Sequence, residues 1–517
     1  MSNRPLKVLY YNWVDYLDAD KRGGGVSVYQ KAVVESLAGD DKVQISFIAS
    51  GTEFSLFRKQ PHVKEIKPYL GSRRFELMNS QVPAPGHLAF DNPACIHAQE
   101  TTRVFAEFIK SQGGFDVIHF NNLEGLPAEV LALRDEFKET KFIFSLHNYY
   151  AVCPQVNLWW REKDNCTDSK GGRNCIACLD YEPSSNWVRK ANLLSRTLHR
   201  FGLAKNSRPH RLIFHLIDDS YRTIKNVLKS SKPVELKVVK PSENSPLQYQ
   251  QRRRQDFTHY VNTYCDCVLA VSGRVAEVAA KFGIDPALIR ISYIGTKVAE
   301  SYIPPDMSLL REQVENKSSI VLGYLGYMRR DKGFYFLMDA LESMPEELTR
   351  KISVVIAARM SDPSIPHRLA LIADSFHSVE FSDGYTHDML DDLYGKIDLA
   401  VVPVLWEDNL PQVAIESVCH HTPVLSSDLG GAKEMGGSNA GFIFRAGDRE
   451  QFYDRLQAFV DDPTRLLDFW NTSRVPTTMQ EHANELLEIY RQSGRNRISS
   501  DESSDLIAND QALRSVS

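Results

Sequence analysis

Short runs of β-branched and aromatic residues recur along the first half of the chain, separated by segments whose apolar residues follow a helical period. Runs of this length alternating with helical segments favour parallel strands connected by helices. The sequence therefore predicts a parallel sheet covered by helices. The expected strands of this first series are 8–11, 43–48, 117–120, 142–146 and 268–271.

A second series of the same kind follows Pro304 and Pro305, with expected strands at 321–325, 354–357, 379–381, 399–402 and 424–426. A chain of 517 residues is too long for one ordinary hydrophobic core. We therefore expect two doubly wound α/β lobes, an amino-terminal lobe at 1–290 and a carboxyl-terminal lobe at 291–475. A final amphipathic helix is expected at 476–493, packed on one of the lobes, and the polar residues 494–517 are expected to be a disordered tail.

The amino-terminal lobe carries two additions, a Cys-rich loop at 151–180 and a basic insertion at 181–256. The insertion shows no strand rhythm but has helix-like stretches at 188–201 and 220–228. Between residues 189 and 254 it holds 16 lysines and arginines against 4 acidic residues. Two interpretations stay open: a solvated insertion, or a surface that meets an anionic acceptor or an anionic membrane leaflet.

Composition narrows the class of protein. The chain is 43% hydrophobic and 25% charged, with a formal net charge of −5, which argues against whole-chain binding to nucleic acid. The amino terminus shows no signal-peptide pattern, and no run of about 18 or more apolar residues is present for a membrane span. We expect a cytoplasmic protein whose contact with a membrane, if any, is peripheral and on its inner face.

Candidate chemistry begins at the first strand. Gly24 and Gly25 follow Gly23 where an apolar-periodic helix opens, and backbone without side chains at a helix amino terminus can approach a phosphate. Such glycines can equally be turn residues. In the second lobe, the loop after strand 321–325 carries Arg329, Arg330 and Lys332. These cations suit a diphosphate leaving group, although the two arginines can also be read as solvated.

The most informative stretch follows strand 399–402. It places Asp408, Asn409 and Leu410 in a loop before a helix, with Glu416 inside that helix. Both carboxylates can face a crevice at the carboxyl ends of the strands, where open α/β sheets bind ligands. The next strand begins with Pro423 and Val424, and a loop with Gly430, Gly431 and Glu434 follows.

Taken together, these motifs resemble family 4 of the retaining glycosyltransferases, whose two facing Rossmann-like lobes form the fold called GT-B. The family pattern is an acidic residue, seven intervening residues and a glutamate, followed by a Pro-Val strand and a Gly-Gly-x-x-Glu turn. Here Asp408 and Glu416 have that spacing, and Glu434 closes the turn. The resemblance covers about residues 7–490, apart from the basic insertion.

The resemblance implies roles for individual residues. Glu416 would bind the nucleotide ribose, Asp408 the hydroxyls of the donor sugar and Lys332 the diphosphate. Gly24 and Gly25 would approach the diphosphate from the other lobe, Arg329 or Arg330 would add a second cation, and Asn409 and Leu410 would complete the donor site. His147, which ends strand 142–146, matches a family histidine near the reacting sugar.

The implied reaction is transfer with retention at the anomeric carbon, from a UDP- or GDP-sugar to a glycan or lipid-linked acceptor, without obligatory Mg²⁺. Such a reaction belongs to polysaccharide or surface-glycan biosynthesis. A GT-B sugar-nucleotide epimerase or hydrolase is an alternative enzyme. A non-catalytic nucleotide-sugar-binding scaffold is a third reading, against which the intact Asp408, Glu416 and Lys332 speak.

Three positions depart from the family pattern. Asp408 stands where glutamate is more usual, Tyr327 where arginine is frequent, and Ile294 where asparagine often precedes the glycine. The shorter acid keeps its charge but can alter the preference for the donor sugar. The tyrosine weakens the assignment of the second phosphate cation.

Four of the eight cysteines cluster in the Cys-rich loop: Cys153, Cys166, Cys175 and Cys178. Four thiolates that end in a Cys-x-x-Cys pair suit a structural Zn²⁺ that would order the loop. An iron–sulfur cluster and free or disulfide-bonded thiols stay open as alternatives. A nucleic-acid-binding zinc module is disfavoured because the loop carries acidic residues and lacks a basic face.

Overall fold

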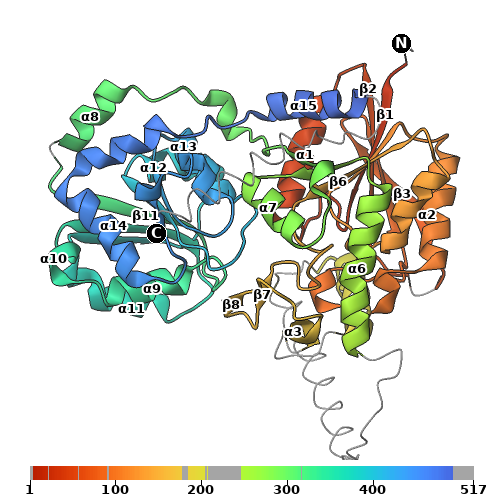
Figure 1. Ribbon diagram of the computed structural model, residues 1–517, viewed down its shortest axis with the longest axis horizontal. Helices are drawn as coiled ribbons and strands as arrows, with labels where there is room; N and C mark the ends of the chain where they lie inside the picture. Colours follow the sequence, from red (N-terminus) through yellow and green to blue (C-terminus); the bar gives the residue numbers. More distant parts are fainter. Residues whose placement is uncertain are drawn as a thin grey trace, which may run out of the picture.

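The computed structural model of the chain describes residues 4–20, 22–55, 58–89, 92–176, 178, 184–203, 207, 246–315 and 317–492. These residues form two α/β lobes that lie side by side (Figure 1). Each lobe is built on its own sheet, and the buried apolar residues of both lobes belong largely to one continuous core. The predicted two-lobed architecture is confirmed.

The amino-terminal lobe holds, among the described residues, an eight-stranded sheet in the order β10-β9-β6-β5-β1-β2-β4-β3. All neighbouring strands are parallel except β3, which pairs antiparallel with β4 at the edge. The strands are β1 (Leu6–Asn12), β2 (Val43–Ser50), β3 (His62–Tyr69), β4 (Ser72–Met78), β5 (Val117–Phe120), β6 (Lys141–Leu146), β9 (Cys267–Ala270) and β10 (Ile289–Ile291).

Helices cover both faces of this sheet. On the side toward the other lobe lie α1 (Gly24–Leu37) and α7 (Gly273–Lys281), and on the outer side lie α2 (Gln99–Ser111) and α6 (Pro246–Tyr264) (Figure 1). The Cys-rich loop adds a short hairpin, β7 (Trp159–Trp160) with β8 (Asp164–Asn165), and the short helix α3 (Arg173–Ile176). The connection after β1 and the helix α1 therefore stand at the boundary between the lobes.

The carboxyl-terminal lobe holds a parallel sheet in the order β13-β12-β11-β14-β15-β16. Its strands are β11 (Ile320–Tyr327), β12 (Ile352–Arg359), β13 (Ser378–Ser382), β14 (Leu399–Val402), β15 (Val424–Ser427) and β16 (Ile443–Phe444). Its helices are α8 (Met307–Glu315), α9 (Phe334–Glu342), α10 (Glu346–Thr349), α11 (Ile365–Ile372), α12 (Leu390–Tyr394), α13 (Gln412–Cys419) and α14 (Arg449–Asp461).

All ten strands expected from the sequence are present, and both sheets also contain strands that the pattern did not reveal. The edge strand β3 carries mostly half-buried or exposed side chains, several of them charged, so it lacks a hydrophobic run. Its partner β4 contains Arg73, Arg74 and Glu76. β10 and β16 have only three and two residues, too few to show a period.

The last helix, α15 (Met479–Arg491), crosses back to the amino-terminal lobe and packs on α1 (Figure 1). Thr478 and Glu481 form a capping box at its start. At its end, the hydroxyl of Tyr490 lies 2.6 Å from His119 Nδ1 and donates to Tyr10 at 3.0 Å. The expected amphipathic helix is therefore present, and it joins residues 479–491 to the first lobe.

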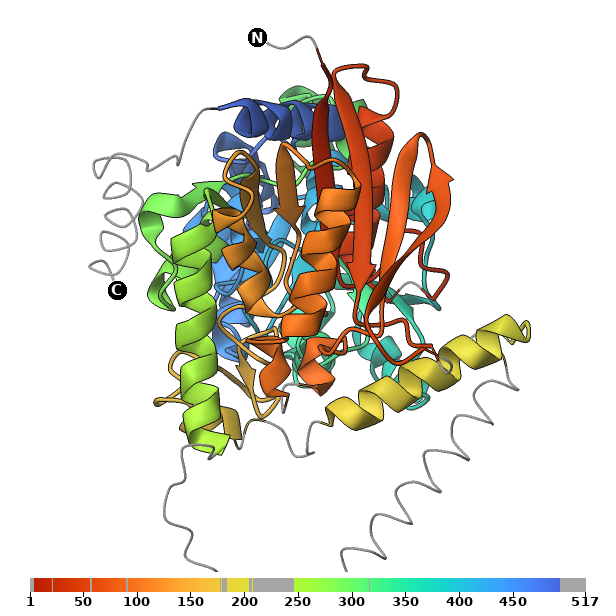
Figure 2. The ribbon, with the colours of Figure 1, turned by 90° about the vertical axis from the view of Figure 1, so that its right-hand side faces the viewer.

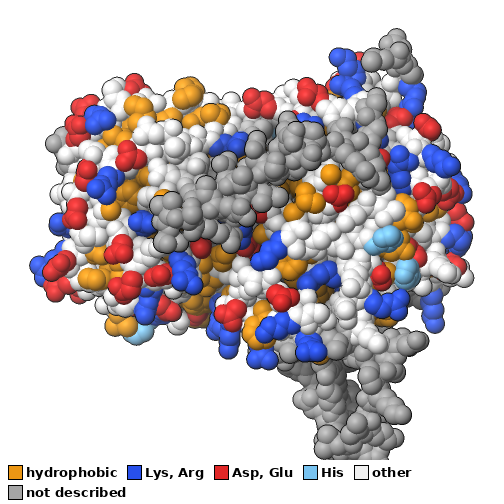
Figure 3. Space-filling model, in the orientation of Figure 1, with side chains coloured by type: hydrophobic (Ala, Val, Ile, Leu, Met, Phe, Trp, Pro, Cys, Tyr) orange, Lys and Arg blue, Asp and Glu red, His pale blue; other side chains and the backbone are white. Residues whose placement is uncertain are grey.

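The basic insertion is described only in part. The helix expected at 188–201 is present as α4 (Ser185–Arg200), which Ser184 caps and which lies across one end of the first lobe (Figure 2). The expected helix at 220–228 and the tail 494–517 lie outside the described residues. On the face shown in Figure 3, acidic and basic side chains are interspersed over the coloured surface. No helix within the described ranges is long and apolar enough to cross a bilayer.

Gly333 at the start of α9 should be the least replaceable glycine of this region. Its φ is +73°, and an added Cβ would lie 1.7 Å from the carbonyl oxygen of Pro403. We expect Gly333→Ala to lower the free energy of unfolding by about 2–5 kcal/mol, because left-handed strain adds to overpacking. Denaturant unfolding measures this. Gly24→Ala is the matched control, since Gly24 has φ +53° but no atom within 4 Å of an added Cβ; equal losses in both variants would contradict the steric argument.

Candidate active site

A hydrogen bond between the lobes fixes the centre of the candidate site. The side-chain amide of Asn409, in the loop after β14, donates to the carbonyl of Leu146 at the end of β6 over 3.1 Å. In return, the hydroxyl of Ser272 donates to the carbonyl of Asn409 over 2.8 Å. The carboxyl end of β6 in the first lobe therefore lies directly against the loop that carries Asp408.

Lys332 and Asp408 are 76 residues apart in sequence and meet at this centre. The ammonium of Lys332 donates to Asp408 Oδ2 over 2.5 Å and lies 5.3 Å from the centre of the Trp406 ring. The Asp408 side chain is 8% exposed and that of Lys332 is 26% exposed. The structure thus brings together two residues that were selected separately from the sequence, with the cation on the more open side.

Glu416 is a buried carboxylate on α13, which begins after Pro411. The residue is 4% exposed, and its Oε2 has no hydrogen-bond partner among the described residues. Burial raises the pKa of Glu416, partly offset by the charges of His387 and His420. A buried acceptor without a partner is costly and is usually satisfied by a ligand or water. Glu416 is thus placed to accept hydrogen bonds from hydroxyl groups.

His147 follows β6 and lies one residue beyond the carbonyl that binds Asn409. Its ring centre is 4.6 Å from that of Tyr29, and its buried Nε2 has no hydrogen-bond partner among the described residues. Burial lowers the pKa of His147 to about 3, with a further contribution from His482. The imidazole is therefore neutral near pH 7 and can give or take a hydrogen bond but carries no charge.

Gly24 and Gly25 stand at the start of α1, where the helix has no side-chain cap. An added Cβ at either glycine meets no atom within 4 Å, whereas one at Gly23 would lie 1.9 Å from the hydroxyl oxygen of Ser27. Gly23 is thus required by packing, and Gly24 and Gly25 face open space. Unbonded N–H groups in open space at a helix start are suited to an anion.

The two arginines of the β11–α9 loop differ in their side-chain contacts. Arg329 forms a two-pronged ion pair with Asp331, which is 3% exposed, while the guanidinium itself stays exposed. Burial and then the charge of Arg329 lower the pKa of His87 to about 4, so this loop approaches the 86–88 turn of the first lobe. Arg330 is exposed, and its guanidinium has no hydrogen bond or ion pair with the described residues, although its carbonyl accepts from the N–H of Gly333.

Glu407 and Glu434, neighbours of the predicted donor residues, anchor the lobes to each other. Both oxygens of Glu407 accept from Arg274, at 2.6 and 3.0 Å, and Glu434 accepts from the backbone N–H groups of Gly273 and Arg274. Burial opposes ionisation of Glu407, but Arg274 outweighs it and the pKa of Glu407 lies below its usual value. The Gly-Gly-x-x-Glu turn is thus part of the contact between the lobes.

Sequence reasoning missed Glu124, which follows β5. Its carboxyl group accepts from the N–H of Gly86 over 2.6 Å and from the amide of Asn148 over 2.8 Å. Burial raises the pKa of Glu124 to about 7, only partly offset by these hydrogen bonds. The polar run Asn121, Asn122 and Glu124 directly after strand 117–120 was the available signal. Glu124 therefore fixes the position of Asn148, which follows His147, and of the 86–88 turn that the Arg329 loop approaches.

The structure does not support the zinc prediction. Within the described residues, no group of three or more His, Cys, Asp or Glu side chains is arranged to hold a metal ion. All four thiols are free, and those of Cys166 and Cys178 donate to the Asp168 carbonyl and to Gln155 Oε1. Burial raises the pKa of the Cys166, Cys175 and Cys178 thiols, and neighbouring cysteines add to the shift. Burial therefore disfavours the thiolate form of these three cysteines.

Residues 319–462 match the family described as glycosyl transferases group 1. No curated protein sequence matches the chain. The solved sucrose-phosphate synthase of Thermosynechococcus elongatus is similar with a TM-score of 0.53 at 14% identity, over 94% of this chain and 98% of that chain.

Two further structures are similar over 94% of this chain. The α,α-trehalose-phosphate synthase (UDP-forming) of Burkholderia xenovorans, solved with glucose-6-phosphate, has a TM-score of 0.53 at 11% identity, with 100% of that chain covered. A glycosyltransferase of Rickettsia africae has a TM-score of 0.51 at 15% identity, with 98% of that chain covered. These similarities confirm the expected GT-B fold.

Proposed function

We propose that the chain transfers a sugar, with retention, from a nucleotide-diphospho-sugar to a glycan or lipid-linked acceptor. The match of residues 319–462 to the group 1 glycosyl transferases and the GT-B fold support this proposal. The observation that carries the proposal is the buried carboxylate of Glu416, whose Oε2 has no hydrogen-bond partner among the described residues, on the helix that follows the loop of the Lys332–Asp408 pair. One edge thereby offers an acceptor for ribose hydroxyls, a cation for the diphosphate and an acid for the sugar.

Donor binding in this proposal uses both lobes. Glu416 accepts the two vicinal hydroxyls of the ribose, which relieves its unfavourable burial. Lys332 and the open amino terminus of α1 at Gly24 and Gly25 receive the diphosphate. Asp408 accepts from hydroxyls of the donor sugar, while Asn409 keeps the end of β6 in place. The Burkholderia enzyme is UDP-forming, which makes UDP-sugars the first donors to test, followed by GDP-sugars.

The proposed chemistry is front-face substitution. The bond between the anomeric carbon and the diphosphate oxygen breaks, the acceptor oxygen bonds to the same face of that carbon, and the acceptor proton passes to the departing phosphate. Negative charge grows on the diphosphate, where Lys332 stabilises it more in the transition state than in the ground state. His147 is neutral and donates or accepts one hydrogen bond at the reacting sugar. No step requires Mg²⁺.

The setting of the reaction is part of the proposal. Polysaccharide or surface-glycan precursors that are lipid-linked are built at the inner face of a membrane, and the basic residues of 181–256 would meet anionic lipid there. The contact would be peripheral, through surface charge. Its strength should fall as salt is raised, since exposed charges are screened within about 8–10 Å at ~0.1–0.15 M salt.

A donor screen with product analysis tests the function. Purified protein is incubated with UDP-, GDP- and ADP-sugars, with and without a pool of glycan and lipid-linked acceptors, and nucleoside diphosphate release is recorded. We expect release to depend on the acceptor, and NMR of the product to show the anomeric configuration of the donor. Release without acceptor would indicate a hydrolase, isomerised donor an epimerase, and binding without turnover a scaffold. Each of these results would contradict the transferase proposal.

A further inference from the structure

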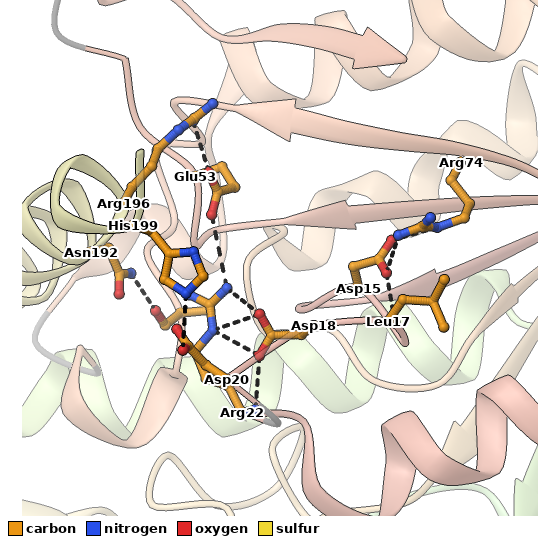
Figure 4. A network of polar contacts seen from close by, with 11 residues as sticks. Asp15, Leu17, Asp18, Asp20, Arg22, Glu53, Arg74, Asn192, Arg196 and His199 are labelled. Carbon is orange, nitrogen blue, oxygen red and sulfur yellow. Dashed lines mark hydrogen bonds and ion pairs between the residues drawn. The ribbon is translucent and has the colours of Figure 1, made fainter. Parts of the chain in front are cut away.

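A pocket of about 340 Å³ lies in the amino-terminal lobe, and none of the residues assigned to the donor is among its lining residues. It opens beyond the carboxyl ends of the neighbouring strands β1 and β2, and α4 of the basic insertion closes its rim (Figure 4). Its volume is within the ~300–1,000 Å³ typical of small-molecule sites. It is lined by Asp15, Leu17, Asp18, Ala19, Asp20, Arg22, Thr52, Glu53, Ile66, Arg74, Glu76, Ser195, Arg196 and His199.

Each of the three guanidinium groups in this lining is already paired with a carboxylate. Arg74 donates to both oxygens of Asp15 at 2.5 and 3.0 Å, and Arg22 donates to both oxygens of Asp18, the closest at 2.7 Å. Arg196 forms an ion pair of 2.9 Å with Glu53 (Figure 4). The pocket therefore has no uncommitted arginine among its described residues with which to receive an anion.

Glu76, on β4, is the carboxylate of the lining that has no hydrogen bond or ion pair among the described residues. Burial raises its pKa to about 7, and the charge of Glu53 adds to the shift. The opposing cations are Arg196, which is committed to Glu53, and Lys64. A cation bound beside Glu76 and Glu53 would give the Glu76 carboxylate an ionic partner. It would also reduce the repulsion between the two carboxylates.

One loop joins the pocket to the proposed donor site. The connection from β1 to α1 supplies Asp15, Asp18 and Arg22 to the pocket and, directly after them, Gly24 and Gly25 to the proposed diphosphate position. Hydroxyl groups can bind the paired carboxylates and guanidiniums without breaking the ion pairs, because a carboxylate has about four lone-pair sites. A phosphate would instead meet five carboxylates, and would have to take a guanidinium from a buried partner.

We propose that this pocket binds the acceptor, and that the acceptor is an unphosphorylated saccharide carrying a primary amino group, with its ammonium between Glu76 and Glu53. The role of this ligand as acceptor rests on the proposed function, whereas the preference of the pocket for an amino sugar does not. The pocket thus selects against sugar phosphates of the kind bound in the Burkholderia structure. Asp18, Asp20 and His199 at the rim receive the hydroxyls of the saccharide.

Calorimetric titration in the absence of donor tests this preference. The probes are glucosamine, glucose and glucose-6-phosphate, added at pH 7 to the full-length wild type, to Glu76→Gln and to Glu450→Gln. Glu450 is an exposed glutamate at the start of α14 in the other lobe, so its variant is a matched control. We expect wild type and control to bind glucosamine at least ~10-fold more tightly than glucose, the range of one hydrogen bond to a charged group.

Glu76→Gln should bring glucosamine and glucose within about 3-fold of each other. The melting temperature should stay unchanged or rise, because the variant removes a half-buried carboxylate whose ionisation is opposed by desolvation and by Glu53. Glucose-6-phosphate should bind most weakly throughout. Binding of glucose-6-phosphate as tight as that of glucosamine, or a glucosamine preference that survives Glu76→Gln, would overturn the proposal. If the variant fails to fold, the proposal is judged on the selectivity of the wild type alone. UDP titrated into the same samples reports the donor site separately, so the pocket can fail while the proposed function stands.

Discussion

Glu416→Gln is expected to lower kcat/KM for the nucleotide-sugar donor by ~10²–10³-fold, because it weakens two hydrogen bonds to a charged group, each worth ~1.5–3 kcal/mol. The amide keeps the size of the side chain but can accept through one atom only. The loss should appear mainly as weaker donor binding, since the ribose does not change during the reaction. Steady-state kinetics with varied donor, together with calorimetric titration of the nucleoside diphosphate, measures both quantities.

The same variant should not lose stability. Burial raises the pKa of Glu416 in the folded protein, so its ionised form opposes folding, and this penalty grows as the pH rises from the unfolded-state pKa toward the folded-state value. Glutamine should therefore leave the free energy of unfolding at pH 7 unchanged or higher. Glu450→Gln, exposed and distant, is the control. Full donor affinity in Glu416→Gln, or a loss of stability that matches the loss of activity, would mean that Glu416 is a structural residue.

Lys332→Met is expected to lower activity about as much as Glu416→Gln, but through kcat and not through donor binding. If the ammonium stabilises the charge that develops on the departing diphosphate, kcat should fall by ~10²–10³-fold, as for removal of one preorganised electrostatic contact. Lys332→Arg keeps the charge but changes its geometry, and should retain more activity than Lys332→Met. Single-turnover kinetics with saturating donor separates this effect on chemistry from an effect on binding.

Asp408 provides the control for Lys332. Lys332→Met leaves the Asp408 carboxylate, 8% exposed, without its cation, so some stability should be lost. Adding Asp408→Asn should recover that stability but not the activity, because the diphosphate contact stays absent. Recovery of both would show that the Lys332–Asp408 pair only stabilises the loop. An unchanged kcat in Lys332→Met would remove Lys332 from the proposed mechanism.

The hydrophobic pattern predicted the fold well where strands are buried. β1, β5, β9, β11, β12 and β14 are largely buried on both faces and are mostly apolar, so they appear as nearly continuous runs in the sequence. β3 was missed because an edge strand keeps one side in water, and its charged residues hide the period. The packing of α15 on the first lobe depends on contacts of Tyr490 with residues more than 300 positions away, which no local pattern contains.

In the candidate site, too, some residues could be predicted from the sequence and others could not. Asp408, Glu416 and Lys332 could be selected because they lie in the loops, or on the helix, that follow predicted strands, and the structure brings Lys332 and Asp408 into contact. Arg274 and Glu124 were missed because their importance comes from long-range partners, Glu407 for the first and Gly86 and Asn148 for the second. The cysteine spacing predicted zinc, but spacing alone does not fix the directions of four thiols. Loop geometry decides that, and it places two of them on polar acceptors.

The central claim, that the edge formed by Lys332, Asp408 and Glu416 holds a nucleotide sugar, is tested most directly by hydrogen–deuterium exchange with and without the donor that the screen identifies. Bound donor should slow amide exchange in peptides covering 407–416, 329–333 and the start of α1, and leave exchange in β4, which carries Glu76, unaffected. Protection at these three segments would support the donor site in the place described. Protection confined to other segments, or none with a donor that binds, would contradict the account.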